Sequence, residues 1–285
     1  MADVFVTGGS GYLGRALLRE LGDDGDRVSA LARSDAAAAV VRGLGATPVR
    51  GDLDDVALLR AAAARADAVV HLGQVGADTA AVDLAAEEAM LDGVGPGPYV
   101  HTGGLWVFGT TDGVADENAP LRPPRLTAWR VANERRVLSR SEHGGHPVVV
   151  MPAIVYGQAR GLVQSSLVDT AGERVLFPGA GANRWGLVHV DDIAQLYLRA
   201  LGAPAGQSYL GVTQCLPVVE VAQALARAPG NPQRAVSVST EEFAGRLGLL
   251  GEALLMDQQL SADRARQQLG WSPTHLDAVA ELARG

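Results

Sequence analysis

The stretch Thr7-Gly8-Gly9-Ser10-Gly11-Tyr12-Leu13-Gly14 decides the fold of this chain. An apolar run at 4–6 precedes it and a helical pattern at 15–21 follows it, which predicts a strand, a glycine-rich turn and a helix. Gly8 permits the tight turn, Gly11 lets the backbone approach a pyrophosphate, and Gly14 lets the helix pack closely on the strand. The N–H groups that begin the helix would bind the phosphates of a dinucleotide, whereas a glycine turn without a ligand is the alternative.

Strand and helix signals continue to alternate through the first half of the chain. Apolar strands are expected at 27–32, 47–50, 67–72, 99–102 and 147–151, with helical segments between them. This pattern predicts an α/β fold with a doubly wound parallel sheet of the Rossmann type. The less regular second half predicts a small, mostly helical C-terminal lobe that holds the substrate.

Two units are expected from this division. Residues 1–155 would form the dinucleotide-binding domain, which also receives about 186–212. Residues 156–185 and 213–285 would form the substrate-binding lobe.

Composition and charge exclude several classes of function. The 285 residues are 47% hydrophobic and 20% charged, as in a soluble globular protein, and the net charge of −8 argues against nucleic-acid binding. The single cysteine, Cys215, cannot form an internal disulfide, and no metal is expected. No apolar run approaches the ~18 residues of a membrane span, and the first residues do not resemble a signal peptide. We therefore expect a cytoplasmic protein.

The chain contains no lysine, so all 24 of its basic residues are arginine. A GC-biased genome is sufficient to explain this composition. Whatever the cause, no mechanism that needs a lysine amine is open to this protein.

Several motifs together resemble the extended short-chain dehydrogenase/reductase superfamily, in particular its epimerase/dehydratase-like branch. They occur in order at the spacing of that family: the glycine stretch 7–14, Gly51-Asp52-Leu53, Val69-Val-His-Leu72, Val107-Phe-Gly109, Pro152-Ala-Ile-Val-Tyr-Gly157 and Val188-His-Val-Asp-Asp192. The resemblance implies a nucleotide cofactor on the N-terminal sheet and a C-terminal lobe that closes over the substrate.

The cofactor contacts implied by the resemblance fall in three places. Asp52 and Leu53 match the pair beside the adenine, although Asp52 is alternatively a cap for a helix that starts at 54. Leu72 and Gly73 match the turn that passes over the ribose. The phosphate loop would comprise Thr7, Gly8, Gly11, Tyr12, Leu13 and Gly14.

The end of the second strand favours NADP(H) over NAD(H). An NAD site usually has an acidic residue there that binds the ribose 2′-hydroxyl. This chain has Ala32-Arg33-Ser34, in which Arg33 can grip a 2′-phosphate and Ser34 can add a hydrogen bond. The alternative is that Arg33 is only a solvated residue at the end of a strand.

The family's catalytic signature is absent. Counted from Gly109, its Ser or Thr position is Gly104, its Tyr position is Trp129 and its Lys position is Asn133. The usual relay depends on a tyrosine whose pKa a neighbouring ammonium lowers from about 10. An indole and an amide cannot perform that chemistry.

Other residues could take over parts of the site. Thr102, His101 and Tyr156 are the candidates for proton transfer, although strand alternation points His101 away from Thr102. Gly104 and Trp129 would line the substrate site, where the indole could stack on the nicotinamide or a flat substrate. Asn133 could bind the nicotinamide ribose. Two further residues, Arg184 and Trp185, would lie on the substrate side.

Three functional hypotheses follow. The first is an atypical NADP(H)-dependent reductase of a small, rather apolar carbonyl, imine or enone compound. The second is an isomerase, lyase or cyclase of secondary metabolism with no net redox change. The third is a non-catalytic NADP(H)-binding sensor or regulator, because one fold serves many functions. The partner is expected to be a small molecule, and homodimerisation through two helices, common in the superfamily, stays open.

Overall fold

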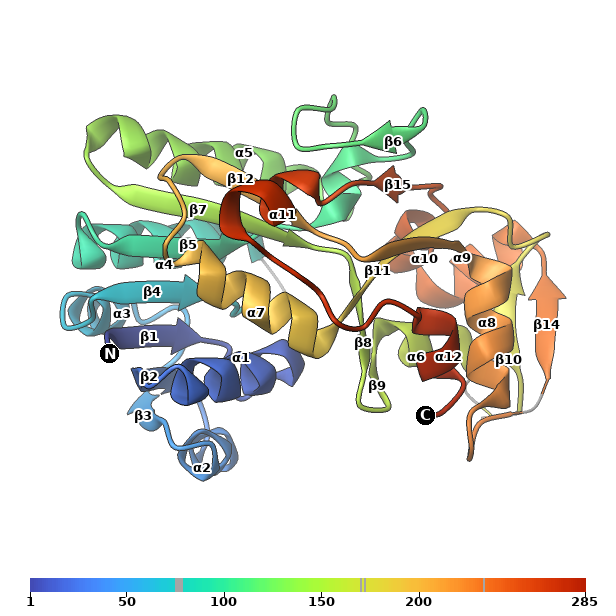
Figure 1. Cartoon of the computed structure of the whole chain (residues 1–285), viewed down its shortest axis with the longest axis horizontal. Coiled ribbons are helices and arrows are strands. Elements are labelled where there is room, and N and C mark those ends of the chain that lie inside the picture. Colours follow the sequence, from blue (N-terminus) through green and yellow to red (C-terminus); the bar gives the residue numbers. More distant parts are fainter. Residues whose placement is uncertain (75–78, 170, 172, 233) are drawn as a thin grey trace.

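Seven parallel strands form the central sheet of the computed structural model, which describes residues 1–74, 79–169, 171, 173–232 and 234–285 (Figure 1). The strand order is β12-β7-β5-β4-β1-β2-β3, so the direction in which successive strands are added reverses between β1 and β4. Ligands bind such sheets at the carboxyl ends of the strands near this reversal. The strands are β1 (Asp3–Thr7), β2 (Arg27–Ala32), β3 (Thr47–Arg50), β4 (Ala68–His71), β5 (Pro98–Thr102), β7 (His146–Pro152) and β12 (Gln207–Gly211).

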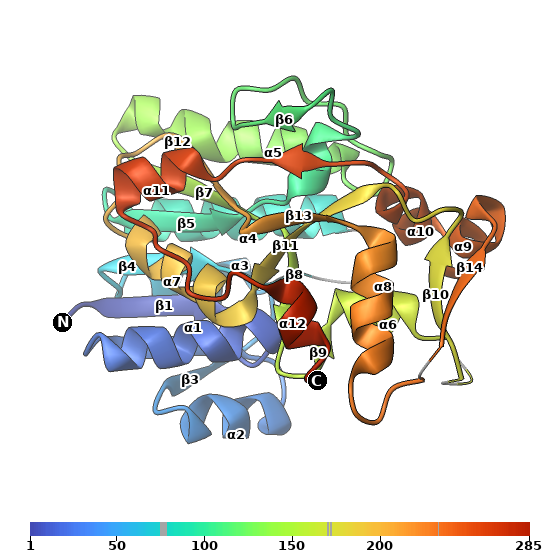
Figure 2. The same ribbon diagram turned by 45° about the vertical axis from the view of Figure 1, so that its right-hand side comes forward.

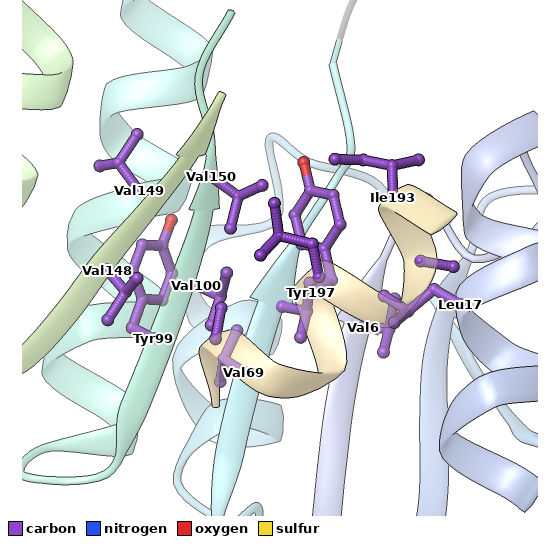
Figure 3. Packing of buried hydrophobic residues seen from close by; sticks show 14 of the residues in the cluster. Val6, Leu17, Val69, Tyr99, Val100, Val148, Val149, Val150, Ile193 and Tyr197 are labelled. Carbon is purple, nitrogen blue, oxygen red and sulfur yellow. The ribbon is translucent and has the colours of Figure 1, made fainter. Parts of the chain in front are cut away.

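Helices cover both faces of this sheet, as the sequence pattern predicts. On one face lie α1 (Tyr12–Asp23) and α7 (Val190–Ala200), and on the other lie α3 (Val56–Ala63), α4 (Thr79–Val94) and α5 (Ala128–Ser139); α2 (Asp35–Gly43) packs beside β2 and β3. Figure 3 shows Tyr197 and Ile193 of α7 against the sheet, near Val100 and Val6. Fully buried valines from neighbouring strands make the sheet apolar on both faces, which requires helices on each side.

A smaller lobe continues from the end of the sheet (Figure 2). Its four-stranded sheet has the order β13-β11-β8-β9, and a second pair joins β10 to β14. The lobe has a hydrophobic core of its own, which includes Trp185, Phe243 and Leu225. Its elements are β8 (Ile154–Gly157), β9 (Arg160–Gly161), α6 (Leu162–Leu167), β10 (Val175–Pro178), β11 (Arg184–His189), β13 (Gln214–Pro217), α8 (Val218–Arg227), β14 (Ala235–Val238), α9 (Thr240–Leu247), α10 (Leu249–Leu254) and α12 (Ala278–Leu282).

The boundary between the two units differs from the expected one in two places. β11 pairs with β8 and β13 in the lobe rather than with the central sheet, although 186–212 was expected in the first domain. Conversely, β15 (Gln259–Leu260) and α11 (Asp263–Leu269) pack on the core of the central sheet, because Ala265 and Trp271 are buried there. The remaining short elements are η1 (Leu105–Phe108), β6 (Val114–Ala115) and η2 (Arg140–His143).

The architecture confirms the predicted doubly wound α/β fold. Within the described ranges, none of the helices has the length and apolar character needed to cross a membrane.

Candidate functional site

The glycine loop between β1 and α1 has the geometry that a dinucleotide needs. Gly8 has a φ of +72°, and a Cβ there would lie 2.9 Å from the backbone nitrogen of Gly73. A Cβ at Gly14 would overlap the carbonyl oxygen of Gly8, so this close packing of helix and loop needs glycine. Gly11 is the N-cap residue of α1, and among the described residues no side chain caps that end of the helix. Uncapped N–H groups and a bare loop fit a pyrophosphate.

A cavity of about 350 Å³ opens beside this loop. Its walls are formed by the glycine loop, the end of β2, the turn after β3 and the turn after β4. The carboxyl ends of these strands meet at this edge of the sheet. The lining residues are Gly8, Ser10, Gly11, Leu31, Arg33, Asp52, Leu53, Leu72, Gly73 and Gln74. Seven residues predicted from sequence as cofactor contacts thus lie together: Gly8, Gly11, Arg33, Asp52, Leu53, Leu72 and Gly73.

Asp52 is not the cap of the following helix. Its Oδ1 accepts a hydrogen bond from the backbone N–H of Leu53, at 2.8 Å. Asp55 caps α3 instead, because its side chain accepts from the N–H of Leu58. The carboxylate of Asp52 is therefore held at the cavity wall.

The other residues expected to contact the cofactor lie around this cavity without lining it. The Thr7 hydroxyl is buried, 2.6 Å from Nδ1 of His71, and accepts from the N–H of Gly73. Ser34 caps α2, since its hydroxyl oxygen accepts from the N–H of Ala37. Leu13 packs against the core and Gly14 is buried under the loop.

Tyr12 connects the loop to the smaller lobe. Its O–H donates to the carbonyl oxygen of Gly157 at 2.8 Å, while burial raises the pKa of the phenol. This hydroxyl stays protonated near neutral pH and therefore acts as a donor.

A second cavity, of about 440 Å³, lies at the carboxyl ends of β5 and β7 and extends toward the smaller lobe. Gln74 lines this cavity and the cavity of the glycine loop, so the two are adjacent. Most of the wall is apolar. It is lined by Tyr12, Gln74, Thr102, Gly103, Gly104, Leu105, Trp106, Leu126, Thr127, Arg130, Pro152, Ala153, Ile154, Val155, Leu162, Gly186 and Gln258.

Arg130 is the one cation among the described residues that line the second cavity. Nη1 donates to the carbonyl oxygen of Thr102 at 3.1 Å, and Nη2 donates to Oε1 of Gln74 at 2.9 Å. The guanidinium carbon also lies 4.6 Å from the centre of the Trp129 ring. These contacts hold a positive charge where the two cavities meet, and a guanidinium has five N–H donors, more than these bonds use.

The hydroxyl of Thr102 is occupied by two hydrogen bonds. It donates to the carbonyl oxygen of His71 at 2.7 Å and accepts from the O–H of Tyr197 at 2.8 Å. Burial raises the pKa of Tyr197, so that phenol remains a donor. The Thr102 proton is therefore committed to a backbone carbonyl, which disfavours its transfer to a substrate.

Comparison with known proteins places the chain in a family. The family model described as "NAD dependent epimerase/dehydratase family" matches residues 4–212. The chain belongs to this family. It is therefore an NAD(P)-dependent enzyme of the epimerase/dehydratase type, and the glycine loop fits the cofactor that the family binds.

The chain is also similar to individual curated proteins and solved structures. Protein C2A9.02 of Schizosaccharomyces pombe is 29% identical over 98% of each chain. The 2-alkyl-3-oxoalkanoate reductase of Stenotrophomonas maltophilia is 28% identical over 88% of this chain and 82% of its own. The solved structure of UDP-glucose 4-epimerase with UDP-glucose from Thermotoga maritima has a TM-score of 0.81 at 17% identity, covering 99% and 96% of the two chains. That structural likeness supports the fold alone.

Motif spacing in the sequence places the family's Tyr position at Trp129 and its Lys position at Asn133, and the structure does not bring these two side chains to the second cavity. Neither residue lines the second cavity, and the buried Asn133 donates to the carbonyl oxygen of Ala80 on α4. The cavity is lined instead by Leu126 and Arg130, which lie three residues before Trp129 and Asn133, respectively. The register is displaced because α5 begins at Ala128 and turns Asn133 toward α4. Gly104, which was predicted to contact the substrate, lies on the wall of this cavity.

Two of the predicted proton-transfer residues lie elsewhere. His101 is buried under α4, where its Nδ1 is 3.4 Å from Oε1 of Glu87, and burial lowers its pKa to about 3. Tyr156 is buried edge-on to His189 in the smaller lobe, where burial raises the pKa of its phenol. Neither lines the cavity at Arg130, because each side chain points to the opposite side of its strand.

The predicted substrate contacts Arg184 and Trp185 also lie away from this cavity. The Trp185 indole is buried and donates to the carbonyl oxygen of Leu254, while the backbone of Arg184 donates to Asp257. The neighbouring Gly186 is the part of β11 that reaches the cavity. Sequence reasoning missed Arg130 and Gln74, although the lack of lysine left arginine as the cation that could occupy such a site.

Proposed function

We propose that this protein is an NADP(H)-dependent reductase of a small, rather apolar ketone, imine or enone. The observation that carries the proposal is the pair of adjacent cavities. One follows the glycine loop, and the other is mostly apolar with the Arg130 guanidinium at the junction. An apolar cavity with a few convergent polar groups is typical of a small-molecule site.

Arg33 supports NADP(H) as the cofactor. It lines the cavity of the glycine loop directly after β2, where an NAD site has an acidic residue. Its side chain is exposed and can form two charge-assisted hydrogen bonds to a phosphate. The hydroxyl of Ser34, at the start of α2, still has a proton that it can donate to the same group.

Arg130 would perform the electrostatic part of the reduction. When bound, the cofactor would supply a hydride, and negative charge would develop on the substrate oxygen or nitrogen as the hydride is transferred. Free N–H donors of Arg130 can bind that atom, and donors fixed before the reaction stabilise such charge strongly. Gln74 and the Thr102 carbonyl fix the guanidinium in advance. The completing proton would come from water, because the Thr102 hydroxyl is committed elsewhere.

The relative from Stenotrophomonas maltophilia supports this reaction class. Its name gives it as a reductase of 2-alkyl-3-oxoalkanoates, compounds with a ketone, a carboxylate and an apolar chain. A mostly apolar cavity with one guanidinium suits substrates of this kind. We therefore propose ketones of this type as the first substrates to assay.

Oxidation of NADPH tests the proposal against its two rivals. A reductase consumes NADPH with a ketone, imine or enone from a broad panel, with one product formed for each cofactor oxidised. A cyclase or isomerase would convert substrate without net loss of NADPH absorbance at 340 nm. Tight NADPH binding without turnover on the whole panel would favour the sensor.

A further inference from the structure

A group of buried polar side chains lies between the sheet and α4, behind the strands that carry the cavity. His71 and His101 are register partners on the adjacent strands β4 and β5, so both imidazoles face the same helix. Asp83 and Glu87 lie one turn apart on α4 and face the imidazoles. All four side chains are at most 4% exposed.

Some polar atoms in this group lack a hydrogen-bond partner within the described part of the chain, although Nδ1 of His101 lies 3.4 Å from Oε1 of Glu87. Neither carboxylate oxygen of Glu87 has a hydrogen-bond partner among the described residues, and the same holds for Nδ1 of His101. The Tyr99 hydroxyl and Oε1 of the buried Glu134 nearby also lack partners within the described part of the chain. Each buried polar atom left unpaired costs roughly 1–3 kcal/mol, and more when charged. An occupant that binds several of these atoms at once would remove this cost.

We infer that Asp83, Glu87 and His101 form a binding site for a divalent transition-metal ion. Each offers one ligand atom, and the three atoms lie within 4.8 Å of one another. An imidazole nitrogen with two carboxylate oxygens is a donor set that suits Zn²⁺ or Mn²⁺. The ion would satisfy the unpartnered atoms of Glu87 and His101 and neutralise the buried carboxylates together.

Residues around the three ligands support the assignment. His71 holds Asp83 through Nε2, 3.2 Å from Oδ1, and its Nδ1 is 2.6 Å from the Thr7 hydroxyl. Ligating carboxylates in metal sites are usually oriented by hydrogen bonds of this kind. The Thr7 hydroxyl oxygen also accepts a hydrogen bond from the N–H of Gly73. Hydrogen bonds would therefore link the metal site to the turns that border the cofactor cavity. The ion would therefore stabilise the carboxyl ends of β1, β4 and β5.

A groove of about 840 Å³ lies between α4 and α5, next to this group. It is lined by Glu87 and by the charged residues Glu88, Asp92 and Arg136. The ion would enter from this side after a small movement of the side chains that bury Glu87.

Metal content and thermal stability test the site. The purified wild-type protein, dialysed against Zn²⁺ or Mn²⁺ and then against buffer, should retain about one ion per chain by plasma mass spectrometry. Glu87→Gln and His101→Asn should each reduce that content at least tenfold. Glu88→Gln is the matched control, since Glu88 is on the same helix but pairs with Arg136 at the groove rim. This control should retain the ion.

A second measurement covers the case in which the variants fail to fold. Removal of the ion from the wild-type protein with a chelator should lower its Tm, and Zn²⁺ or Mn²⁺ should restore it. The proposal is overturned if the wild-type chain holds less than a tenth of an ion and neither metal shifts its Tm. An infrared carbonyl band from a protonated carboxyl that disappears in Glu87→Gln would then show that Glu87 shares a proton with Asp83.

Discussion

Replacing Arg130 by methionine should impair catalysis far more than stability. The change removes the guanidinium from the junction of the two cavities, with its bonds to the Thr102 carbonyl and to Gln74. Loss of a fixed donor to a developing charge costs roughly 10²- to 10³-fold in kcat, or about 2.7–4 kcal/mol. Arg130 is only partly buried and already uses two N–H donors, so we expect the lower end, about 100-fold.

The assay is steady-state NADPH oxidation with a 3-oxo acid or a simple ketone that the wild-type enzyme reduces. Arg130→Lys should lose about tenfold, because it retains the charge without the planar fork. Arg135→Met is the matched control, since Arg135 is exposed on the same helix and does not line the cavity, and it should behave as wild type. A folded Arg130→Met variant with kcat and KM close to those of the wild type would refute the role given to Arg130.

Three further variants probe the cofactor site and the lobe junction. Gly14→Ala should abolish NADPH binding in a fluorescence titration, because its Cβ overlaps the Gly8 carbonyl. Gly22→Ala lies on the same helix, its Cβ meets no atom of the described residues within 4 Å, and it should bind NADPH normally. Arg33→Gln should weaken NADPH by about 10- to 100-fold and leave NADH unchanged, as expected when charged hydrogen bonds to a phosphate are lost; equal loss for both cofactors would argue against a phosphate contact. Burial lowers the pKa of His189 below its usual 6.5, so the unfolded chain gains a proton that the folded protein excludes. The free energy of unfolding in urea should therefore fall as the pH drops below that value. If His189→Gln showed the same dependence of this free energy on pH as the wild type, this account would be contradicted.

The sequence was sufficient for the fold and for most of the cofactor cavity because the constraints there are local. The glycines fix the backbone of the loop wherever the chain goes afterwards, as Gly8 and Gly14 show. The residues that follow β2, β3 and β4 must meet at one edge of a parallel sheet. Arg33, Asp52 and Gly73 line one cavity for this reason, and their placement could be predicted without knowing how side chains pack.

The substrate side depended on packing that local pattern does not contain. Spacing alone placed Trp129 and Asn133 in the site, but the first turn of α5 and the contact of Asn133 with α4 rotate Arg130 into it. His101 shows the opposite case, since strand alternation pointed it away from Thr102 and the structure buries it under α4. The packing of α11 against the core of the central sheet likewise depends on Trp271, whose indole donates to the carbonyl oxygen of Asp192.

Transfer of deuterium is the most direct test of the proposed reduction. NADPH labelled at C4 on the transferred face should deliver one deuterium to the reduced carbon of the product, with an equal amount of NADP⁺ formed. Wild-type protein that converts the substrate without incorporating deuterium, while the NADPH is unchanged, would contradict the account and leave the enzyme redox-neutral.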